Sequence, residues 1–404
     1  MADQTPTILQ IVPRLDTGGA ELSTLEIVAA LVRTGARALV ATEGGRMAER
    51  VTALGGEIIT LPLETKNPVT IFANGQHIAS IVRERSVSLV HARSRAPAWS
   101  ALMAARRAGV PFVTTYHGAY GERGRIKRLY NSVMARGDTV IANSRYTSDL
   151  IRSRYGALAG TPVIIPRGVD IARFSPDSID AERRTRLRTA WGIEPHERVI
   201  LHAARLTTWK GQRVLIEAVG RLQAEGRLGN GVLVLAGDAQ GRNDYAEGLR
   251  QLASELGISD RVRLVGHVED IAAAFAVAYV TVVASIEPEA FGRAAAEALA
   301  VGCPTITTNI GAPPEIVLAP PEVPREQATG WHVPPRDAAA LADAIAEALA
   351  MPEAERQAMS ARAVASIAAR FTVAAMQRQT LAVYDGLLGT QLAARFTASQ
   401  THPV

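Results

Sequence analysis

The chain has 404 residues, 48% of them hydrophobic and 21% charged, so it is long enough for two domains that each bury a core. Its single cysteine, Cys303, excludes an internal disulfide and favours a reducing, cytoplasmic setting. The start MADQTPT is unlike a signal peptide, and the uncharged run over residues 271–286 is too short for a membrane span.

The net charge of +5 is unevenly distributed. Residues 1–170 hold 21 Lys and Arg against 13 Asp and Glu, a surplus of +8, which leaves −3 for the rest of the chain. A basic first half predicts an anionic partner. Because the sequence contains no zinc-finger spacing, basic zipper or aromatic-basic RNP string, we expect no nucleic acid and favour an anionic membrane surface or a phosphorylated ligand.

The first half alternates short apolar runs with amphipathic stretches. Strand followed by helix, repeated along a chain, predicts a parallel sheet covered on both faces. We therefore expect a Rossmann-like domain over residues 1–172. Its expected strands are TILQIV (7–12), ALVAT (38–42), EIITLP (57–62), SLVHA (88–92), PFVTTYH (111–117), TVIANS (139–144) and PVIIP (162–166).

The alternation lapses over residues 171–195, a polar, Arg-rich segment that we interpret as hinge and linker, and then restarts. A second Rossmann-like domain is expected over residues 173–372, with a helix within residues 373–390 and a frayed tail over residues 391–404. The expected strands of the second domain are RVILHAAR (198–205), GVLVLAGD (231–238), VRLVGH (262–267), VTVVAS (280–285) and PTITT (304–308).

Two candidate ligand contacts follow strands of the first domain. Gly18 and Gly19 stand where a loop turns into a helix, so backbone N–H groups there could approach an anion, although a plain tight turn explains them equally well. The stretch is not G-x-G-x-x-G, so the dinucleotide fingerprint is absent. His117 ends a strand beside a glycine and is placed to meet a ligand; a satisfied surface histidine is the alternative.

In the second domain, the loop R-L-T-T-W-K-G (205–211) follows a strand. The chain holds only three lysines against 41 arginines, so Lys210 at this loop points to a use for its compact ammonium group. Arg205 and Lys210 could bind phosphate near a helix N-terminus, and two solvated charges are the alternative.

The stretch SIEPEAFGRAAAEALAVG (285–302) places two glutamates eight residues apart. The expected strand ends at Ser285 and a helix begins near Phe291 or Gly292, so Glu289 lies in the loop and Glu297 about two turns into the helix. A diphosphate is favoured in front of the helix, and Glu297 could accept hydrogen bonds from a ribose diol. The alternative, an acidic first turn that stabilises the helix dipole, explains Glu289 but poorly explains Glu297, which lies deep in an alanine run.

The pattern E-A-F-G-x4-E resembles the E-x7-E motif of retaining glycosyltransferase family 4, of the cell-envelope polysaccharide or lipopolysaccharide type. Further blocks resemble those of the family in the same order across nearly the whole chain. Arg167 replaces the asparagine more usual before G-V-D, and Ala290 stands where glycine or proline is common. The blocks are G-G-A-E (18–21), T-T-Y-H-G (114–118), V-I-A-N-S (140–144), I-P-R-G-V-D (165–170), A-R-L-T-T-W-K-G (204–211), L-A-G-D (235–238), V-R-L-V-G-H-V (262–268) and T-G-W-H-V-P-P-R-D (329–337).

The resemblance implies the GT-B fold: two Rossmann-like domains facing across a crevice, the first binding the acceptor and the second a nucleotide-sugar, with a C-terminal helix crossing back to the first. It implies that Arg205 and Lys210 hold the diphosphate and Glu297 the ribose, while the backbone at His267 and Val268 lies along the base. Glu289, with the N–H groups near Phe291 and Gly292, would meet the donor sugar. The Gly18-Gly19 loop would close over the diphosphate, and His117 would lie near the sugar.

The function implied is transfer of a hexose-type sugar, with retention, from a nucleoside-diphosphate sugar to a glycan, lipopolysaccharide or lipid-linked acceptor. The sequence has no D-x-D motif, so we expect no metal and no cofactor; the donor is a substrate, UDP-sugar favoured over GDP-sugar. A nucleotide-sugar epimerase of GT-B fold and a non-catalytic nucleotide-sugar-binding protein are the alternatives. A phosphorylase would need a lysine for pyridoxal phosphate, and neither Lys66 nor Lys127 lies in the second domain.

Residues 119–136, AYGERGRIKRLYNSVMAR, follow His117 and are strongly basic. They suggest reversible attachment to an anionic membrane, at the inner face of the cytoplasmic membrane. A helix here would carry one apolar stripe, which we expect to pack on the protein's own sheet. The cations are Arg123, Arg125, Lys127, Arg128 and Arg136, and the stripe is Ile126, Leu129, Tyr130, Val133 and Met134.

Overall fold

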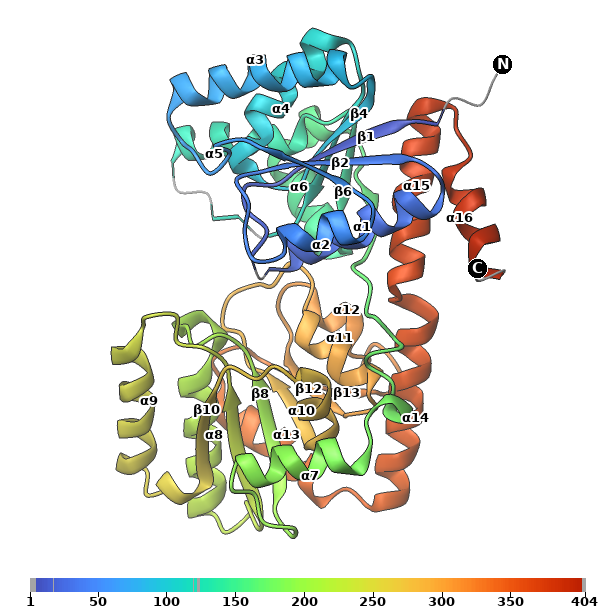
Figure 1. Ribbon diagram of the computed structural model, residues 1–404. Coiled ribbons are helices and arrows are strands. Elements are labelled where there is room, and N and C mark those ends of the chain that lie inside the picture. Colours follow the sequence, from blue (N-terminus) through green and yellow to red (C-terminus); the bar gives the residue numbers. More distant parts are fainter. Residues whose placement is uncertain (1–4, 17, 119, 122–123, 402–404) are drawn as a thin grey trace. The chain divides into compact units, whose positions relative to one another are not determined.

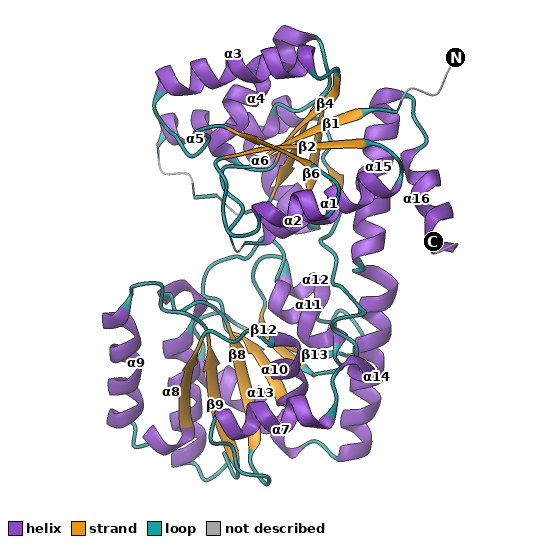
Figure 2. Ribbon diagram, viewed as in Figure 1, coloured by secondary structure: helices purple, strands orange, loops and turns teal. Residues whose placement is uncertain are grey.

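A computed structural model describes residues 5–16, 18–118, 120–121 and 124–401. The chain forms two compact units. Unit 1 combines Met1–Gly168 with Val373–Val404, and unit 2 is the continuous segment Val169–Thr372. In each unit the strands form one sheet with helices on both of its faces (Figures 1 and 2).

The described part of unit 1 holds seven parallel strands in the order β3-β2-β1-β4-β5-β6-β7. Successive residues of a strand point to opposite faces, so each face has a core of its own. Leu9 of β1 packs with α3 and α4, whereas its neighbour Ile8 packs with α1, α15 and α16. The strands are β1 (Thr7–Ile11), β2 (Arg37–Thr42), β3 (Glu57–Thr60), β4 (Val87–Ala92), β5 (Phe112–Tyr116), β6 (Thr139–Ala142) and β7 (Val163–Ile164). The helices are α1 (Gly19–Arg33), α2 (Ala48–Ala53), α3 (Pro68–Glu84), α4 (Arg95–Ala108), α5 (Arg125–Asn131), α6 (Arg145–Ala159), α15 (Val373–Leu388) and α16 (Leu392–Thr401).

Unit 2 holds six parallel strands in the order β10-β9-β8-β11-β12-β13. The strands are β8 (Arg198–Ala203), β9 (Gly231–Ala236), β10 (Val262–Gly266), β11 (Ala278–Val283), β12 (Thr305–Thr308) and β13 (Gly330–Val333). The helices are α7 (Ala181–Ala190), α8 (Gln212–Ala224), α9 (Asn243–Glu255), α10 (Ile271–Val277), α11 (Arg293–Ala300), α12 (Pro313–Ile316), α13 (Ala338–Ala350) and α14 (Glu353–Arg370). Both sheets confirm the predicted pair of Rossmann-like domains.

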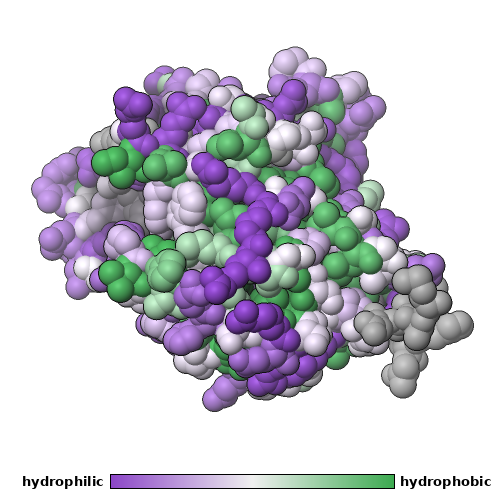
Figure 3. Space-filling model, turned by 90° about the horizontal axis from the view of Figure 1, so that it is seen from above, coloured by the Kyte–Doolittle hydropathy of each residue, from purple (hydrophilic) through white to green (hydrophobic). Residues whose placement is uncertain are grey.

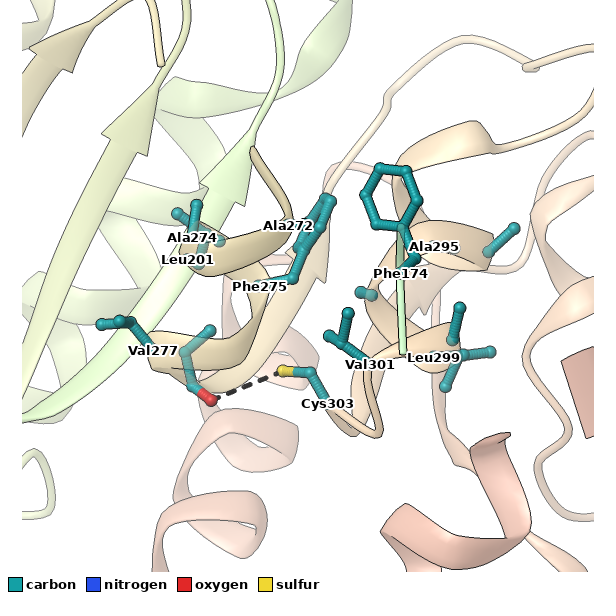
Figure 4. Packing of buried hydrophobic residues seen from close by; sticks show 14 of the residues in the cluster. Phe174, Leu201, Ala272, Ala274, Phe275, Val277, Ala295, Leu299, Val301 and Cys303 are labelled. Atoms are coloured by element: carbon teal, nitrogen blue, oxygen red, sulfur yellow. Dashed lines mark hydrogen bonds between the residues drawn. The ribbon is translucent and has the colours of Figure 1, made fainter. Parts of the chain in front are cut away.

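The uncharged run over residues 271–286 divides into α10 and β11, as predicted. Small side chains let α10 and α11 come close in the core of unit 2, where Ala272 and Phe275 of α10 belong to the same buried cluster as Ala295 of α11 (Figure 4). Cys303 lies in the same core and its thiol reaches the carbonyl oxygen of Ala278 at 3.6 Å. Burial raises the pKa of this thiol to about 11, so the cysteine is a packing residue.

The C-terminal segment completes the core of unit 1. Tyr384 of α15 is fully buried, and its hydroxyl and the Nδ1 atom of His91 share a hydrogen bond of 2.6 Å. The frayed tail predicted after residue 390 was wrong for the described part, because Leu392 and Phe396 bury one side of α16. The carboxylate of Asp385 accepts from the N–H groups of Leu392 and Ala393 and caps that helix.

Two other local predictions were wrong. The segment over residues 171–195 is not a plain linker, because it contains α7, which packs against α10 in unit 2. The apolar stripe after His117 does not pack as one face. Helix α5 ends at Asn131 and a 3₁₀ turn follows, so Val133 and Met134 are buried while Ile126 and Leu129 are 86% and 59% exposed.

Candidate active site

The loops after the adjacent strands β8 and β11 bring two predicted site residues into contact. The Nζ atom of Lys210 lies 2.7 Å from Oε1 of Glu289, and the two side chains are only 15% and 13% exposed. The hydroxyl of Ser285, two residues after β11, donates to the same carboxylate. A largely desolvated lysine and carboxylate are therefore held together at the carboxyl edge of the sheet, where open α/β sheets bind ligands.

A glycine next to Lys210 makes this placement sterically feasible. Lys210 ends a 3₁₀ turn, and Gly211 follows in the left-handed region with φ 77°. A Cβ atom at this position would overlap the carbonyl oxygen of Ala284, the residue after β11. Lys210 thus directly precedes the N-cap of α8, and the dipole of that helix also favours a bound anion.

His202 of β8 lies buried near this pair. Its Nδ1 atom donates to the carbonyl oxygen of Val282 at 2.8 Å. Burial lowers the pKa of His202 to about 4. The hydrogen bond to Val282 opposes this shift. The charge of Lys210 lowers the pKa further, and the charge of Glu289 raises it. His202 is therefore neutral at physiological pH.

We expect the free energy of unfolding to fall as the pH is lowered from 6.5 towards 4. In this pH window His202 is protonated in the unfolded chain but not in the folded one. His202 therefore lowers the free energy of unfolding by about 1.4 kcal/mol per pH unit, or about 3 kcal/mol between pH 6.5 and 4. Denaturant titrations at several pH values measure it. His202→Gln should lower the slope by about 1.4 kcal/mol per pH unit without removing it, because burial also lowers the pKa of His117. His196→Gln, at an exposed loop position, is the control and should leave the slope unchanged. Equal slopes in the wild type and in His202→Gln would contradict this interpretation of His202.

Glu297 is buried on α11. The helix begins at Arg293, after Gly292 with φ 105°, so Glu297 is the fifth helical residue and lies a little over one turn into the helix, where about two turns were predicted. Burial raises the pKa of Glu297, and the adjacent charge of Arg293 opposes that shift. The Nε atom of Arg293 donates to Glu297 Oε1 at 2.5 Å, which orients the carboxylate.

The other predicted donor contacts of unit 2 lie at the same edge of the sheet. Arg205 follows β8 and is exposed, while His267 and Val268 follow β10, the outermost strand. Phe291 is 5% exposed and packs edge-on against Phe371, with ring centroids 5.9 Å apart, so its backbone is the part free to serve a ligand.

In unit 1, His117 contacts Arg167, which stood out in the sequence only as a departure from the family pattern. Nη2 of Arg167 lies 2.9 Å from Nδ1 of His117. Since a guanidinium only donates, Nδ1 accepts and the proton of the neutral ring sits on Nε2. Burial, and then the charge of Arg167, hold the pKa of His117 well below its usual range.

The same arginine explains one glycine of the Gly18-Gly19 loop, which leads into α1. A Cβ atom on Gly19 would overlap the guanidinium group of Arg167. Gly19 therefore serves the packing of Arg167 as well as the helix start. Sequence reasoning also missed Asn143, which follows β6: it is 1% exposed, and its amide has no hydrogen-bond partner among the described residues.

The described residues contain neither a ready-made metal site nor a membrane-crossing helix. No group of three or more His, Cys, Asp or Glu side chains there is arranged to hold a metal ion. None of the helices in the described ranges has the length and apolar character needed to cross a membrane.

Known families match both units. The family described as "Glycosyl transferases group 1" matches residues 183–365, and the one described as "Glycosyltransferase Family 4" matches residues 17–173. The paired α/β sheets, with polar residues at their carboxyl edges, are those of a GT-B glycosyltransferase. The chain belongs to glycosyltransferase family 4.

Individual relatives agree with this assignment. The chain is 29% identical, over 83% of its length and 84% of the relative, to a D-inositol 3-phosphate glycosyltransferase of Xylanimonas cellulosilytica. It is 30% identical, over 71% of its length and 75% of the relative, to a GDP-mannose-dependent alpha-(1-6)-phosphatidylinositol monomannoside mannosyltransferase of Mycolicibacterium smegmatis. The crystal structure of a glycosyltransferase from Rickettsia africae superposes with a TM-score of 0.87 at 30% identity, over 96% of this chain and 100% of that one.

Proposed function

We propose that this glycosyltransferase moves a hexose-type sugar, with retention of anomeric configuration and without a metal ion, from a nucleoside-diphosphate sugar to a glycan, lipopolysaccharide or lipid-linked acceptor. The observation that supports this best is the Lys210–Glu289 pair, held at 2.7 Å beside the N-terminus of α8. It offers one cation for a diphosphate and one acceptor of hydrogen bonds for sugar hydroxyls.

The pair also favours a complete donor over a bare diphosphate. A diphosphate that binds Lys210 competes with Glu289 for the ammonium group and leaves the carboxylate without its counter-charge. The hydroxyl groups of the attached sugar can donate to Glu289 and replace that interaction. In this proposal Arg205 shares the diphosphate, and the N–H groups of Phe291 and Gly292 bind the sugar.

The remaining contacts follow from position and chemistry. Glu297, oriented by Arg293, accepts from the ribose hydroxyls, and the backbone at His267 and Val268 lies along the base. The Gly18-Gly19 loop binds the diphosphate. The Nε2–H group of His117 donates to a hydroxyl of the donor sugar, because Arg167 occupies the other ring nitrogen.

In the reaction, the bond between the anomeric carbon and the diphosphate breaks as the acceptor hydroxyl attacks from the same face. The leaving phosphate takes the acceptor proton. Negative charge grows on the departing oxygen, and Arg205, Lys210 and the helix N-terminus stabilise it. Glu289 is assigned to sugar binding and not to nucleophilic attack.

The first test is a thermal-shift panel of UDP, GDP and their sugars, followed by an assay of diphosphate release with glycan and lipid-linked acceptors. A donor at about 100 times its Kd adds about 2.7 kcal/mol of stability, so the correct nucleotide should stand out. The sequence favours UDP, and the mannosyltransferase relative is named for GDP-mannose, so both bases belong in the panel.

Two other outcomes would contradict the proposal. Isotope exchange at the sugar without an acceptor would indicate a nucleotide-sugar epimerase. Tight donor binding without diphosphate release, whatever the acceptor, would indicate a non-catalytic nucleotide-sugar-binding protein.

We also propose that the enzyme works in the cytoplasm at the inner face of the membrane, held there by the basic segment after His117. Arg125, Lys127, Arg128 and Arg136 lie in the described part of that segment, and Arg123 lies outside it. Each cation near an anionic bilayer contributes about 1 kcal/mol, so binding by charge alone should be reversed by salt. The M. smegmatis relative is named for an acceptor linked to phosphatidylinositol, which agrees with a lipid-linked substrate.

A further inference from the structure

Buried polar atoms without a hydrogen-bond partner gather at one place in unit 1. Arg93 follows β4, His117 follows β5 and Asn143 follows β6, and these three strands are neighbours in the sheet. Among the described residues, none hydrogen-bonds to Nη2 of Arg93, to Nε2 of His117 or to either polar atom of the Asn143 amide. Buried groups of this kind nearly always have a partner, so their gathering at the carboxyl ends of adjacent strands indicates a site for a polar ligand.

The three side chains lie on the face of the sheet that α1 and α15 cover. Ile141, two residues before Asn143, packs in the core on that face, so the alternation along β6 places Asn143 there as well. The Nε atom of Arg93 donates at 2.7 Å to Oε1 of Gln10, whose own amide donates to a carbonyl oxygen of α1. Arg93 is also near His117, because its charge adds to the lowering of the His117 pKa that burial causes.

The chemistry of the group is cationic and rich in donors. Arg93 is 3% exposed and forms no salt bridge with a described residue, although Tyr384 and the charge of Glu26 oppose the lowering of its pKa by burial. A free N–H group of a buried guanidinium fits an oxyanion. The Asn143 amide can accept a hydrogen bond from one hydroxyl group and donate to another. The matching ligand is a polyol that carries a carboxylate or phosphate group.

Access to these groups is from the side of His117. Arg93 and Asn143 are fully buried, whereas His117 and the following Gly118 are half-buried. The face of unit 1 seen from above instead mixes hydrophilic side chains with small groups of hydrophobic ones, a pattern typical of ordinary protein surface (Figure 3). Since His117 meets the donor sugar in the proposed function, a ligand that enters beside it takes the place of the acceptor.

We propose that Arg93 and Asn143 form a subsite for an acidic acceptor, in which Arg93 binds its carboxylate or phosphate group and Asn143 binds a neighbouring hydroxyl group. The inference rests on the proposed transfer reaction and adds the chemical class of the acceptor. The ligand enters as His117 and Gly118 shift, because the unpartnered atoms themselves are covered. Two fixed contacts orient the attacking hydroxyl group, and a neutral acceptor is disfavoured because it leaves the buried charge of Arg93 unpaired.

The test is calorimetric titration of the full-length protein with matched acidic and neutral probes. The protein is first saturated with the nucleoside diphosphate that the thermal-shift panel identifies, so that phosphate probes do not bind at Lys210. The pairs are inositol phosphate against inositol and glucuronate against glucose, which distinguish a phosphate from a carboxylate. The acidic member of at least one pair should bind about 10- to 100-fold more tightly, as expected for a hydrogen bond to a charged group.

Arg93→Met isolates the charge. Methionine fills a similar space and leaves no charge to bury, so the fold should tolerate the change, while acidic and neutral probes should bind about equally. Arg93→Lys keeps a cation without the fork of the guanidinium and should keep part of the preference. Arg107→Met, at an exposed position in the last turn of α4, is the matched control and should keep all of it.

Asn143→Ala tests the hydroxyl contact separately. It should weaken the acidic and the neutral member of a pair alike, by about tenfold, and leave their ratio unchanged. The thermal shift with the nucleotide-sugar should be the same in all these variants, which confirms their folding. A wild type that shows no thermal shift with any donor would contradict the proposed transfer reaction itself, which separates that failure from a failure of the subsite.

Four outcomes would overturn the proposal. Equal binding of acidic and neutral probes by the wild type would indicate a neutral acceptor. A preference for acidic probes that survives Arg93→Met would place the anion elsewhere in the protein. Loss of the donor thermal shift in Arg93→Met would show that the arginine supports the fold. Failure of every probe to bind would assign the buried polar groups to ordered water.

Discussion

Replacing Lys210 by alanine is expected to lower kcat by about 10²- to 10³-fold while weakening donor binding much less. Negative charge on the leaving diphosphate is largest in the transition state, so a cation beside it acts mostly there. The largely desolvated setting strengthens the effect, because Lys210 is only 15% exposed. Steady-state kinetics, together with the Kd of the donor from calorimetry, measure the two quantities separately.

The matched control is Lys66→Ala, which removes another of the three lysines at an exposed position in unit 1. It should leave both quantities unchanged. Glu289→Gln removes the counter-charge of Lys210 and keeps the cation. It should therefore weaken binding of the donor sugar more than it lowers kcat. Equal losses of kcat and of donor affinity in Lys210→Ala would show that the lysine only anchors the ligand.

Replacing Glu297 by alanine is expected to weaken nucleotide binding about a hundredfold. The loss of two hydrogen bonds to a charged acceptor amounts to about 3 kcal/mol. Arg293, which now donates to this carboxylate, is 39% exposed and can turn to solvent, so the fold should tolerate the change. Calorimetric titration with the nucleoside diphosphate measures the effect.

Glu297→Gln separates charge from shape. The amide keeps one oxygen for a ribose hydroxyl, so its affinity should lie between those of the wild type and Glu297→Ala. Glu217→Ala, at an exposed position of α8, is the control and should bind normally. Unchanged affinity in Glu297→Ala would show that the ribose binds elsewhere.

The strands were largely predictable because a parallel sheet buried on both faces needs continuous apolar runs, and such runs stand out between polar loops. The sequence also indicated that Lys210 and Glu289 share the carboxyl edge. Their contact was not predictable, because it depends on β8 and β11 being neighbours although β9 and β10 come between them in the chain. Strand order is a property of packing, and the local pattern does not contain it.

Long-range polar pairs were also missed. Arg167 and His117 are 50 residues apart and meet because their loops end at the same side of the sheet of unit 1. The exposure of Ile126 and Leu129 was missed because helical periodicity assumes a helix that continues, whereas α5 gives way to a 3₁₀ turn. After such a break the side chains of the two segments no longer share one helical face.

The C-terminal helices have a consequence for synthesis on the ribosome. Unit 1 is made first but cannot complete its core until Leu381, Tyr384 and Phe396 have been translated, whereas unit 2 is one uninterrupted segment. Although domains usually fold in the order of translation, here the later unit can finish folding before the earlier one. Until then the apolar surface of α1 and of the first sheet that α15 and α16 later cover stays open, so the nascent chain is most exposed to aggregation and to chaperones at that stage.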